Sequence, residues 1–237
     1  MKRSLKLYLP LLSLSILILS TAARAGVYLE SEVTTRGIPN RPDETRIQKS
    51  YYTTGAFRIE TGSGHIMIMN FNTMTWYRLD PASKTYSEMK LNELADKMPK
   101  MNPEEQKKIM GGMQDNIQVT PTDETKTIEG YKCKKYNVSN MGMKSEHWVT
   151  RDVEAYDELK AIYAGMAKSF ESNPMLSQMN TMSSMSKVQG VPIQTVTQIM
   201  GGQRISTVKK IEKKSLSEDL FKVPGDYTLK ETTRPRQ

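Results

Sequence analysis

Four methionines in the C-terminal half of the chain recur at helical spacing. Met175, Met179, Met182 and Met185 are four, three and three residues apart, which places them on one stripe of a helix. Thioether side chains are unbranched and polarizable, so such a stripe suits contact with apolar partners of varying shape. Thioethers also favour Cu(I), and an ordinary helix packed on a core would show the same spacing. An apolar ligand site, a copper site and a core helix are therefore the three interpretations.

The residues that usually carry catalysis are few. His65, His147 and Cys133 are the complete set of histidines and cysteines, and neither histidine has a His, Cys or Asp nearby at metal-ligand spacing. The sequence contains no G-x-S-x-G, phosphate-binding loop or dinucleotide fingerprint. We expect Cys133 to be a small buried residue and both histidines to be half-exposed strand residues. The sequence thus predicts a protein that is not an enzyme and has no metal site or cofactor.

The first residues have the features of a cleavable signal peptide. Lys2, Arg3 and Lys6 precede the apolar run 9–19, and Ala23-Arg24-Ala25 supplies small residues where a signal peptidase reads. The apolar run is too short to span a membrane, and no cysteine near the site could carry a lipid anchor. We therefore expect cleavage after Ala25 and a periplasmic protein.

Loss of residues 1–25 also changes the charge. That segment holds four basic residues and no acidic ones, so the formal charge of +8 falls to +4. The mature protein is only mildly basic and lacks a basic run interleaved with aromatic residues, so nucleic acid is not an expected partner. Anionic lipid headgroups are a more suitable electrostatic partner.

The elements that would position the methionine stripe are mostly strands. Alternation and turn residues predict a meander of short antiparallel strands at 27–33, 46–52, 56–60, 65–71, 74–79 and 84–89. Asp80-Pro81-Ala82-Ser83 is a turn in which the aspartate side chain accepts backbone hydrogen bonds. Further strands are predicted at 117–128, 131–139, 144–150, 193–200 and 203–212. We expect residues 216–229 to be irregular.

Helices interrupt the strands. Short helices are predicted at 91–98 and from Pro103 to about residue 110. A longer one at 153–171 carries apolar residues at helical spacing, among them Met166. Pro174 opens the methionine-stripe helix, over 174–187. The order of elements indicates an α+β fold: one domain at 26–230, with a helical insert at about 151–189 and a disordered tail at 231–237.

Four segments then resemble a known family. They are Gly26 to Glu30; Trp76 to Pro81 with Lys84 to Tyr86; Gly130 to Tyr136 continuing to 146–152 around Trp148; and Phe221 to Tyr227. In this order they resemble a secreted bacterial family of domain of unknown function 4412 type. That family is similar to the periplasmic lipoprotein carriers of the LolA/LolB superfamily. The resemblance implies an incomplete antiparallel β half-barrel with helices covering its concave face. In the carriers, that face holds acyl chains.

The leading functional hypothesis is a soluble periplasmic binding or carrier protein for an acyl chain, lipid or other apolar ligand. Its candidate ligand-binding residues are the methionine stripe (Met175, Met179, Met182, Met185) together with Met166, Trp76 and Trp148. A methionine-based periplasmic copper-binding protein and a protein-interaction module of the cell envelope are the alternatives. Envelope proteins and the membrane surface are further candidate partners.

Overall fold

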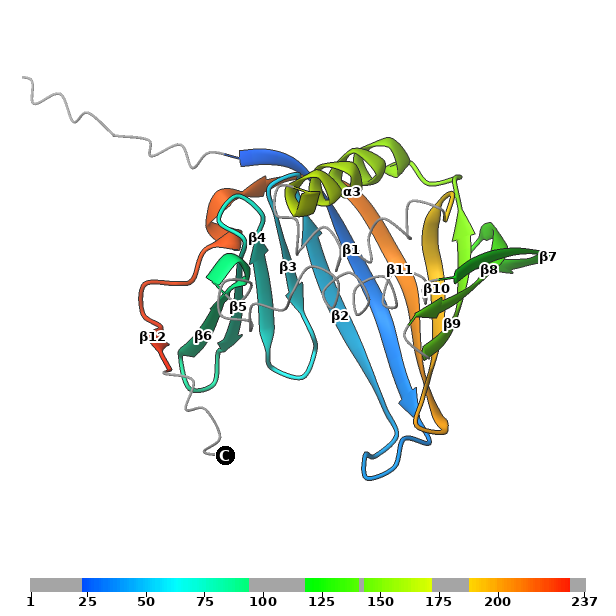
Figure 1. Ribbon diagram of the computed structural model, residues 1–237, viewed down its shortest axis with the longest axis horizontal. Helices are drawn as coiled ribbons and strands as arrows, with labels where there is room; N and C mark the ends of the chain where they lie inside the picture. Colours follow the sequence, from blue (N-terminus) through cyan, green and yellow to red (C-terminus); the bar gives the residue numbers. More distant parts are fainter. Residues whose placement is uncertain (1–22, 94–117, 141–142, 172–187, 231–237) are drawn as a thin grey trace, which may run out of the picture.

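The computed structural model describes residues 23–93, 118–140, 143–171 and 188–230, and these form one open β-sheet (Figure 1). The strands of its first half are β1 (Ala23–Arg36), β2 (Glu44–Tyr52), β3 (Ala56–Glu60), β4 (Ile66–Asn70), β5 (Thr75–Asp80) and β6 (Thr85–Lys90). Those of its second half are β7 (Gln118–Ile128), β8 (Tyr131–Asn140), β9 (Met143–Thr150), β10 (Val191–Ile199), β11 (Gly202–Ser217) and β12 (Thr228–Leu229). The first eleven each correspond to a predicted strand.

The order of strands in the sheet differs from their order in the chain. It runs β12-β6-β5-β4-β3-β2-β1-β11-β10-β9-β8-β7, so β1 lies at the centre and β12 and β7 lie at the two ends. All neighbours pair antiparallel except β12 and β6, which pair parallel. The ends do not pair with each other, so the sheet is not closed. An open, mostly antiparallel sheet confirms the coarse form of the predicted α+β fold.

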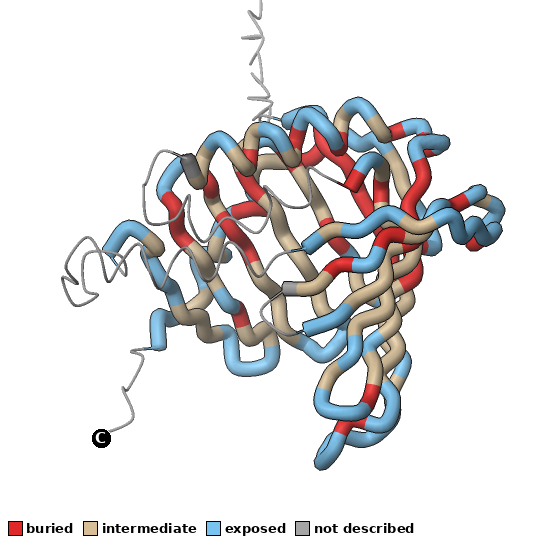
Figure 2. Tube along the Cα trace, turned by 45° about the vertical axis from the view of Figure 1, so that its right-hand side comes forward, coloured by how far each residue is buried: buried red, intermediate tan, exposed pale blue. Residues whose placement is uncertain are grey.

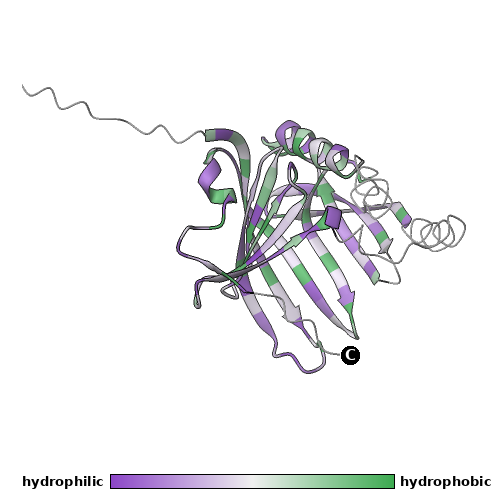
Figure 3. Cartoon of the chain, turned by 60° about the vertical axis from the view of Figure 1, so that its left-hand side comes forward, coloured by the Kyte–Doolittle hydropathy of each residue, from purple (hydrophilic) through white to green (hydrophobic). Residues whose placement is uncertain are grey.

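Local sequence explains the turns of the meander. At the predicted Asp80 turn, the aspartate Oδ1 accepts hydrogen bonds from the backbone N–H of Ala82 at 3.1 Å and of Ser83 at 3.4 Å. Hydropathy alternates along the strands (Figure 3), which allows one face of the sheet to be buried while the other carries polar residues.

Strand β1 begins three residues before the expected mature N-terminus. Ala23 pairs with Ser217, and Arg24 Nε lies 2.6 Å from Glu218 Oε1. The expected cleavage after Ala25 therefore falls within β1, and it stays a prediction.

The segment predicted to be irregular contains more structure than expected. Strand β11 continues to Ser217, whose side chain accepts a hydrogen bond from the Asp219 N–H and caps the 3₁₀ helix η1 (Glu218–Phe221). Phe221 is buried with Ile68, Leu79 and Leu216, and these apolar contacts hold the segment on the sheet. The prediction for 216–229 was wrong in this part because the burial of Phe221 depends on residues far away in sequence.

Helix α3 (Tyr156–Glu171) confirms the predicted long helix and crosses one end of the sheet (Figure 1). Its buried residues Leu159, Ile162 and Met166 belong to one cluster with Val27 and Met69 of the sheet. Many buried positions lie along the strands near this helix, whereas most residues of the loop tips are exposed (Figure 2). Within the described residues, no helix has the length and apolar character needed to cross a membrane.

The other predicted helices fall mainly outside the described residues. Only 91–93 of the helix predicted at 91–98 are described, and they are helical. The helix predicted from Pro103 and the helix predicted at 174–187, with Met175, Met179, Met182 and Met185, lie outside the described ranges, as does the tail 231–237.

Candidate functional site

One face of the sheet carries a continuous row of apolar side chains. Because paired residues on neighbouring strands point the same way, the pairing aligns five of them: Val27, Tyr52, Phe57, Met69 and Trp76. Helix α3 packs on this face, since its buried residues share a cluster with Val27 and Met69. We call it the helix face.

Aromatic rings connect the strands of the helix face to α3. Phe57 lies edge-on to Trp76, with ring centroids 5.5 Å apart, and contacts Phe71 at 5.8 Å. Phe71 in turn contacts Phe170 of α3 at 6.1 Å. Tyr52 of β2 contacts Tyr163 of α3 at 6.4 Å. We call these six residues the aromatic cluster: Tyr52, Phe57, Phe71, Trp76, Tyr163 and Phe170.

The aromatic cluster is apolar and electrically neutral. Phe71 is buried, whereas the other five members are only partly buried and continue the core outward. Burial raises the pKa of Tyr52 and of Tyr163 above the usual tyrosine value, so both hydroxyls keep their protons near neutral pH. This surface offers contact area for an apolar ligand without a charge to desolvate.

The predicted ligand-binding residues fall in three places. Trp76 belongs to the aromatic cluster, and Met166 lies on the buried side of α3 with 1 % of its surface exposed. Trp148 is buried in the same core cluster as Met166, and the four residues of the methionine stripe are outside the described ranges.

Trp148 belongs to the core beneath the helix face. It is 8 % exposed and lies in the same cluster as Val27 and Met166, and Trp76 packs against that cluster. Trp148 pairs with Gln194 beside a bulge in β10, where the alternation of faces is interrupted. The structure thus places both tryptophans on one core, Trp76 at its partly buried margin and Trp148 within it.

Charged residues surround Trp148. The ammonium group of Lys135 lies 5.8 Å from the centre of the Trp148 ring and within 3.2 Å of carboxylate oxygens of both Glu124 and Glu146. The ammonium group of Lys126 lies 5.7 Å from the same ring. Hydrogen bonding to Glu124 raises the pKa of Lys135. Trp148 therefore contacts a cation–π and ion-pair network in addition to the apolar core.

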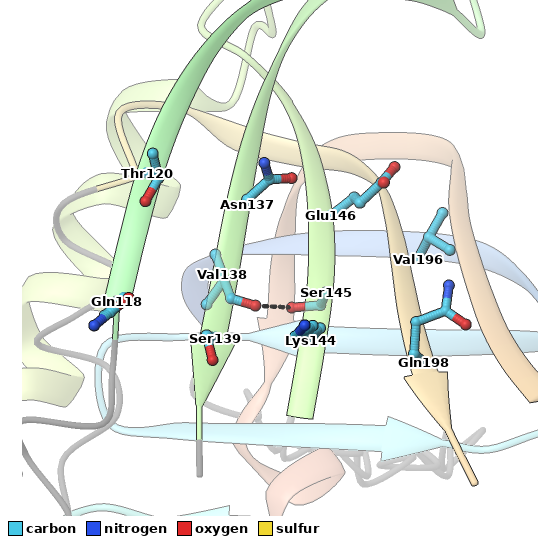
Figure 4. A pocket seen from close by; sticks show the side chains of 10 residues that line it. All are labelled: Gln118, Thr120, Asn137, Val138, Ser139, Lys144, Ser145, Glu146, Val196 and Gln198. Atoms are coloured by element: carbon cyan, nitrogen blue, oxygen red, sulfur yellow. Dashed lines mark hydrogen bonds between the residues drawn. The ribbon is translucent and has the colours of Figure 1, made fainter. Parts of the chain in front are cut away.

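A polar groove of about 400 Å³ lies along β7 to β10 (Figure 4). Eight polar residues and two valines line it: Gln118, Thr120, Asn137, Val138, Ser139, Lys144, Ser145, Glu146, Val196 and Gln198. It could form hydrogen bonds to a polar ligand. Sequence reasoning missed it, because the groove depends on a register between strands that alternation within each strand does not reveal.

The surroundings of His147 and Cys133 determine what chemistry these side chains can support. His147 Nε2 lies 2.9 Å from Ser145 Oγ, but its Nδ1 is buried with no hydrogen-bond partner, so no carboxylate orients the ring. Burial lowers the pKa of His147. Cys133 is 1 % exposed, which confirms the expected buried residue, and burial raises the pKa of its thiol. In the described ranges, no three His, Cys, Asp or Glu side chains gather as a metal site.

Comparison with solved structures finds similar chains of low sequence identity. PNGF-II is 13 % identical with a TM-score of 0.42, covering 88 % of this chain and 31 % of its own, so this chain spans about a third of its length. MucB in the Pseudomonas aeruginosa MucA/MucB complex is 10 % identical (TM-score 0.38; 86 % and 57 % covered). A LolA superfamily protein from Nitrosomonas europaea is 8 % identical (TM-score 0.36; 83 % and 90 % covered).

Comparison with protein families gives the stronger result. No curated protein matches the chain. A family model described as domain of unknown function (DUF4412) matches residues 42–227, which include the aromatic cluster and strands β2 to β11. This confirms the family resemblance seen in the sequence, and the chain belongs to the DUF4412 family.

Proposed function

We propose that the protein is an exported, periplasmic binding or carrier protein for an acyl chain, lipid or other apolar ligand held against the helix face. One observation carries the proposal: the aromatic cluster extends the core outward as a partly exposed apolar surface. Phe57, Trp76 and Tyr52 come from three strands, and Tyr163 and Phe170 come from α3. Such a surface on a protein is usually explained by a partner that covers it.

The energetics favour a ligand with a hydrocarbon chain. Transfer of each CH₂ group from water to an apolar surface gains roughly 0.8 kcal/mol, so about ten buried groups, the length of a fatty acyl chain, correspond to micromolar binding. Partly exposed aromatic side chains offer large contact areas. Met69 and Met166 belong to the core against which the aromatic cluster packs, and their flexible side chains allow this core to adjust to ligands of different shape.

The polar groove is less suitable for such a ligand. An acyl chain placed there would remove Lys144, Glu146 and the amides of Gln118 and Gln198 from water without replacing their hydrogen bonds. Burying unpaired polar groups costs roughly 1–3 kcal/mol each, and charged groups cost more. The helix face carries no comparable cost, so we assign the ligand to that face.

The proposal also includes helices that cover the helix face more fully. Helix α3 supports this because it already packs at one end of that face. The sequence-predicted helix at 174–187 would add its methionine stripe to the ligand site. A copper-binding role for that stripe is the competing interpretation, and Cu(I) titration of the mature protein distinguishes it from lipid binding.

The first test is native mass spectrometry of the gently purified mature protein, in which a co-purified lipid is expected. The second is titration with a fluorescent fatty acid. Phe57→Gln should weaken probe binding by about tenfold, because it places an amide in the aromatic cluster. Tyr77→Gln is the matched control, since Tyr77 pairs with Ile68 and points to the opposite face. Absence of probe binding, or equal losses in both variants, would contradict the proposal.

A further inference from the structure

An exposed methionine occupies a turn position that favours other residues. The turn between β10 and β11 places Met200 and Gly201 at its centre, with φ of 47° and 86°. Two-residue hairpin turns with positive φ at both positions strongly prefer Asn-Gly, because a Cβ in the left-handed region is strained. Met200 is also 82 % exposed, so burial does not compensate for that strain.

The other non-glycine residues with positive φ in the described ranges have local reasons for it. Asn40 is a favoured type in this conformation, and Met74 is 4 % exposed in the core. Lys84 forms an ion pair with Asp226 at 2.9 Å, and Glu129 forms one with Lys209 at 2.7 Å. Among the described residues with positive φ, Met200 is the one whose residue type has no conformational preference, buried contact or charge partner to explain it.

A second exposed methionine lies beside this turn. Met143 begins β9 and is 55 % exposed. Ser145 pairs with Thr197, so the antiparallel register brings Met143 next to Ile199, the residue before Met200. Two thioether side chains therefore project from adjacent hairpins at the same end of the sheet.

The loop between β1 and β2 completes this end. Gly202 packs so closely on that loop that a Cβ would lie 2.4 Å from the carbonyl carbon of Gly37. Arg36 and Arg41 of the loop region and Lys144 beside Met143 are exposed, and none forms an ion pair with another described residue. We call Met143, Met200, Arg36, Arg41 and Lys144 the methionine end. Figure 1 shows its β1–β2 loop and β10–β11 turn at the end of the sheet away from α3.

Nearby carboxylates leave these cations available. Asp43 accepts a hydrogen bond from the Gly37 N–H at 2.8 Å, Glu44 pairs with Arg46, and Glu146 pairs with Lys135. Glu44 and Glu146 are thus bound to other basic residues, and Asp43 is engaged by the backbone. The methionine end combines exposed apolar tips with unpaired positive charges around them.

We propose that the methionine end binds the surface of an anionic phospholipid membrane. The thioether tips of Met143 and Met200 enter the boundary between headgroups and acyl chains, and Arg36, Arg41 and Lys144 contact lipid phosphates. A membrane fits better than a protein partner, because the apolar tips are small and separate while the cations around them lack protein carboxylates. This surface is distinct from the helix face and does not depend on the function proposed there.

The test is flotation of the full mature chain with vesicles of phosphatidylglycerol and phosphatidylethanolamine, compared with vesicles of phosphatidylcholine alone. We expect binding to the anionic vesicles that weakens with added salt. The double variant Met143→Ser and Met200→Asn should bind on the order of tenfold more weakly, because it removes two apolar insertions. Asparagine suits the left-handed position at 200, so folding is preserved. Leu229→Ser is the matched control, since Leu229 is 46 % exposed on β12 and lies outside both the methionine end and the aromatic cluster.

A direct readout comes from Met200→Cys labelled with a polarity-sensitive dye, since the native Cys133 is buried and does not compete for the label. Anionic vesicles should shift the dye emission to the blue. Fatty-acid binding at the helix face should be unchanged in the methionine variants. The proposal is overturned if the wild type does not bind anionic vesicles, or if the double variant binds them with the same affinity as the wild type. It is also overturned if replacing the methionines changes the oligomeric state instead of vesicle binding, which would assign this surface to self-association.

Discussion

Trp76 and Trp148, the two tryptophans of the chain, lie in different parts of one apolar core. Trp76 is partly buried on β5 and packs edge-on to Phe57, whereas Trp148 is 8 % exposed on β9, with its ring near the ammonium groups of Lys126 and Lys135. Each part of the core therefore carries its own fluorescent reporter, which makes the location of a ligand directly measurable.

The first prediction uses these reporters. A brominated fatty acid should quench the emission of Trp148→Phe, which retains Trp76, because the ligand would contact the helix face. The same titration should leave the emission of Trp76→Phe, which retains Trp148, nearly unchanged. Steady-state fluorescence with a non-brominated fatty acid as control measures both. Quenching of Trp148 alone would place the ligand away from the aromatic cluster and contradict the assignment.

The second prediction concerns the methionine stripe, which stays a sequence prediction. Replacing Met175, Met179, Met182 and Met185 with Gln should weaken binding of apolar probes while the sheet remains folded. A core role predicts instead a loss of several kcal/mol in unfolding free energy, because unpaired amides would be buried. A copper site predicts loss of Cu(I) binding with probe affinity intact. Probe titration, denaturant unfolding and Cu(I) titration of one variant distinguish the three.

The third prediction follows from His147. Because burial lowers its pKa in the folded state, the unfolded chain binds this proton more readily. Stability is therefore full above about pH 6.5 and falls as the pH drops toward the folded pKa, by at most about 1.4 kcal/mol per pH unit. Urea unfolding across this range should show a smaller decline for His147→Gln. A parallel decline in both proteins would mean that other groups dominate.

The fourth prediction concerns Cys133. Its side chain is buried beside a strand carbonyl, with Sγ 3.5 Å from the Tyr131 oxygen, and its pKa is raised by burial. Cys133→Ala should cost roughly 1 kcal/mol of unfolding free energy and leave fatty-acid binding intact. A thiol reagent should react slowly with the native protein and rapidly after denaturation. Lost binding in a folded variant would indicate a functional thiol.

The fifth prediction concerns the N-terminus. N-terminal sequencing of the exported protein should give Gly26, so that Arg24 and its ion pair with Glu218 are absent from the mature form. Both side chains of that pair are exposed, and such pairs contribute less than about 1 kcal/mol. Glu218→Gln should therefore leave the stability of a chain beginning at Gly26 unchanged and slightly destabilise one beginning at Ala23. A mature protein that retains residues 1–25 would refute the signal-peptide assignment.

Local chemistry in the sequence is sufficient to predict most elements. Val27 and Leu29 alternate with Tyr28 and Glu30, and the apolar residues of α3 recur at helical spacing, so β1 and α3 could be recognised. The Asp80 turn could be predicted because an aspartate side chain bonds to the backbone two and three residues later. These signals act within a few residues of one another.

Long-range pairing was not accessible in the same way. Val27 pairs with Lys213, nearly the whole length of the chain away, and no local pattern indicates that partner. Six strands separate β5, which carries Trp76, from β9, which carries Trp148, and register shifts occur between them in β11 and in β10. The meeting of both tryptophans and Met166 on one core could therefore be found only from the structure, and their role in ligand binding stays a prediction.

The two ends of the open sheet have consequences for how the protein avoids polymerising. An exposed strand with free N–H and C=O groups is a template for adding further chains. At one end, the backbone N–H groups of Thr228 and Lys230 donate hydrogen bonds to the carbonyls of Lys84 and Tyr86. Strand β12 therefore uses part of the hydrogen-bonding edge of β6. At the other, β7 carries Pro121 and an irregularity between Pro121 and Thr125, followed by charged and exposed residues. The β7 edge is therefore protected by a proline, a distorted backbone and charged side chains. The β6 edge is protected by the C-terminal segment of the chain.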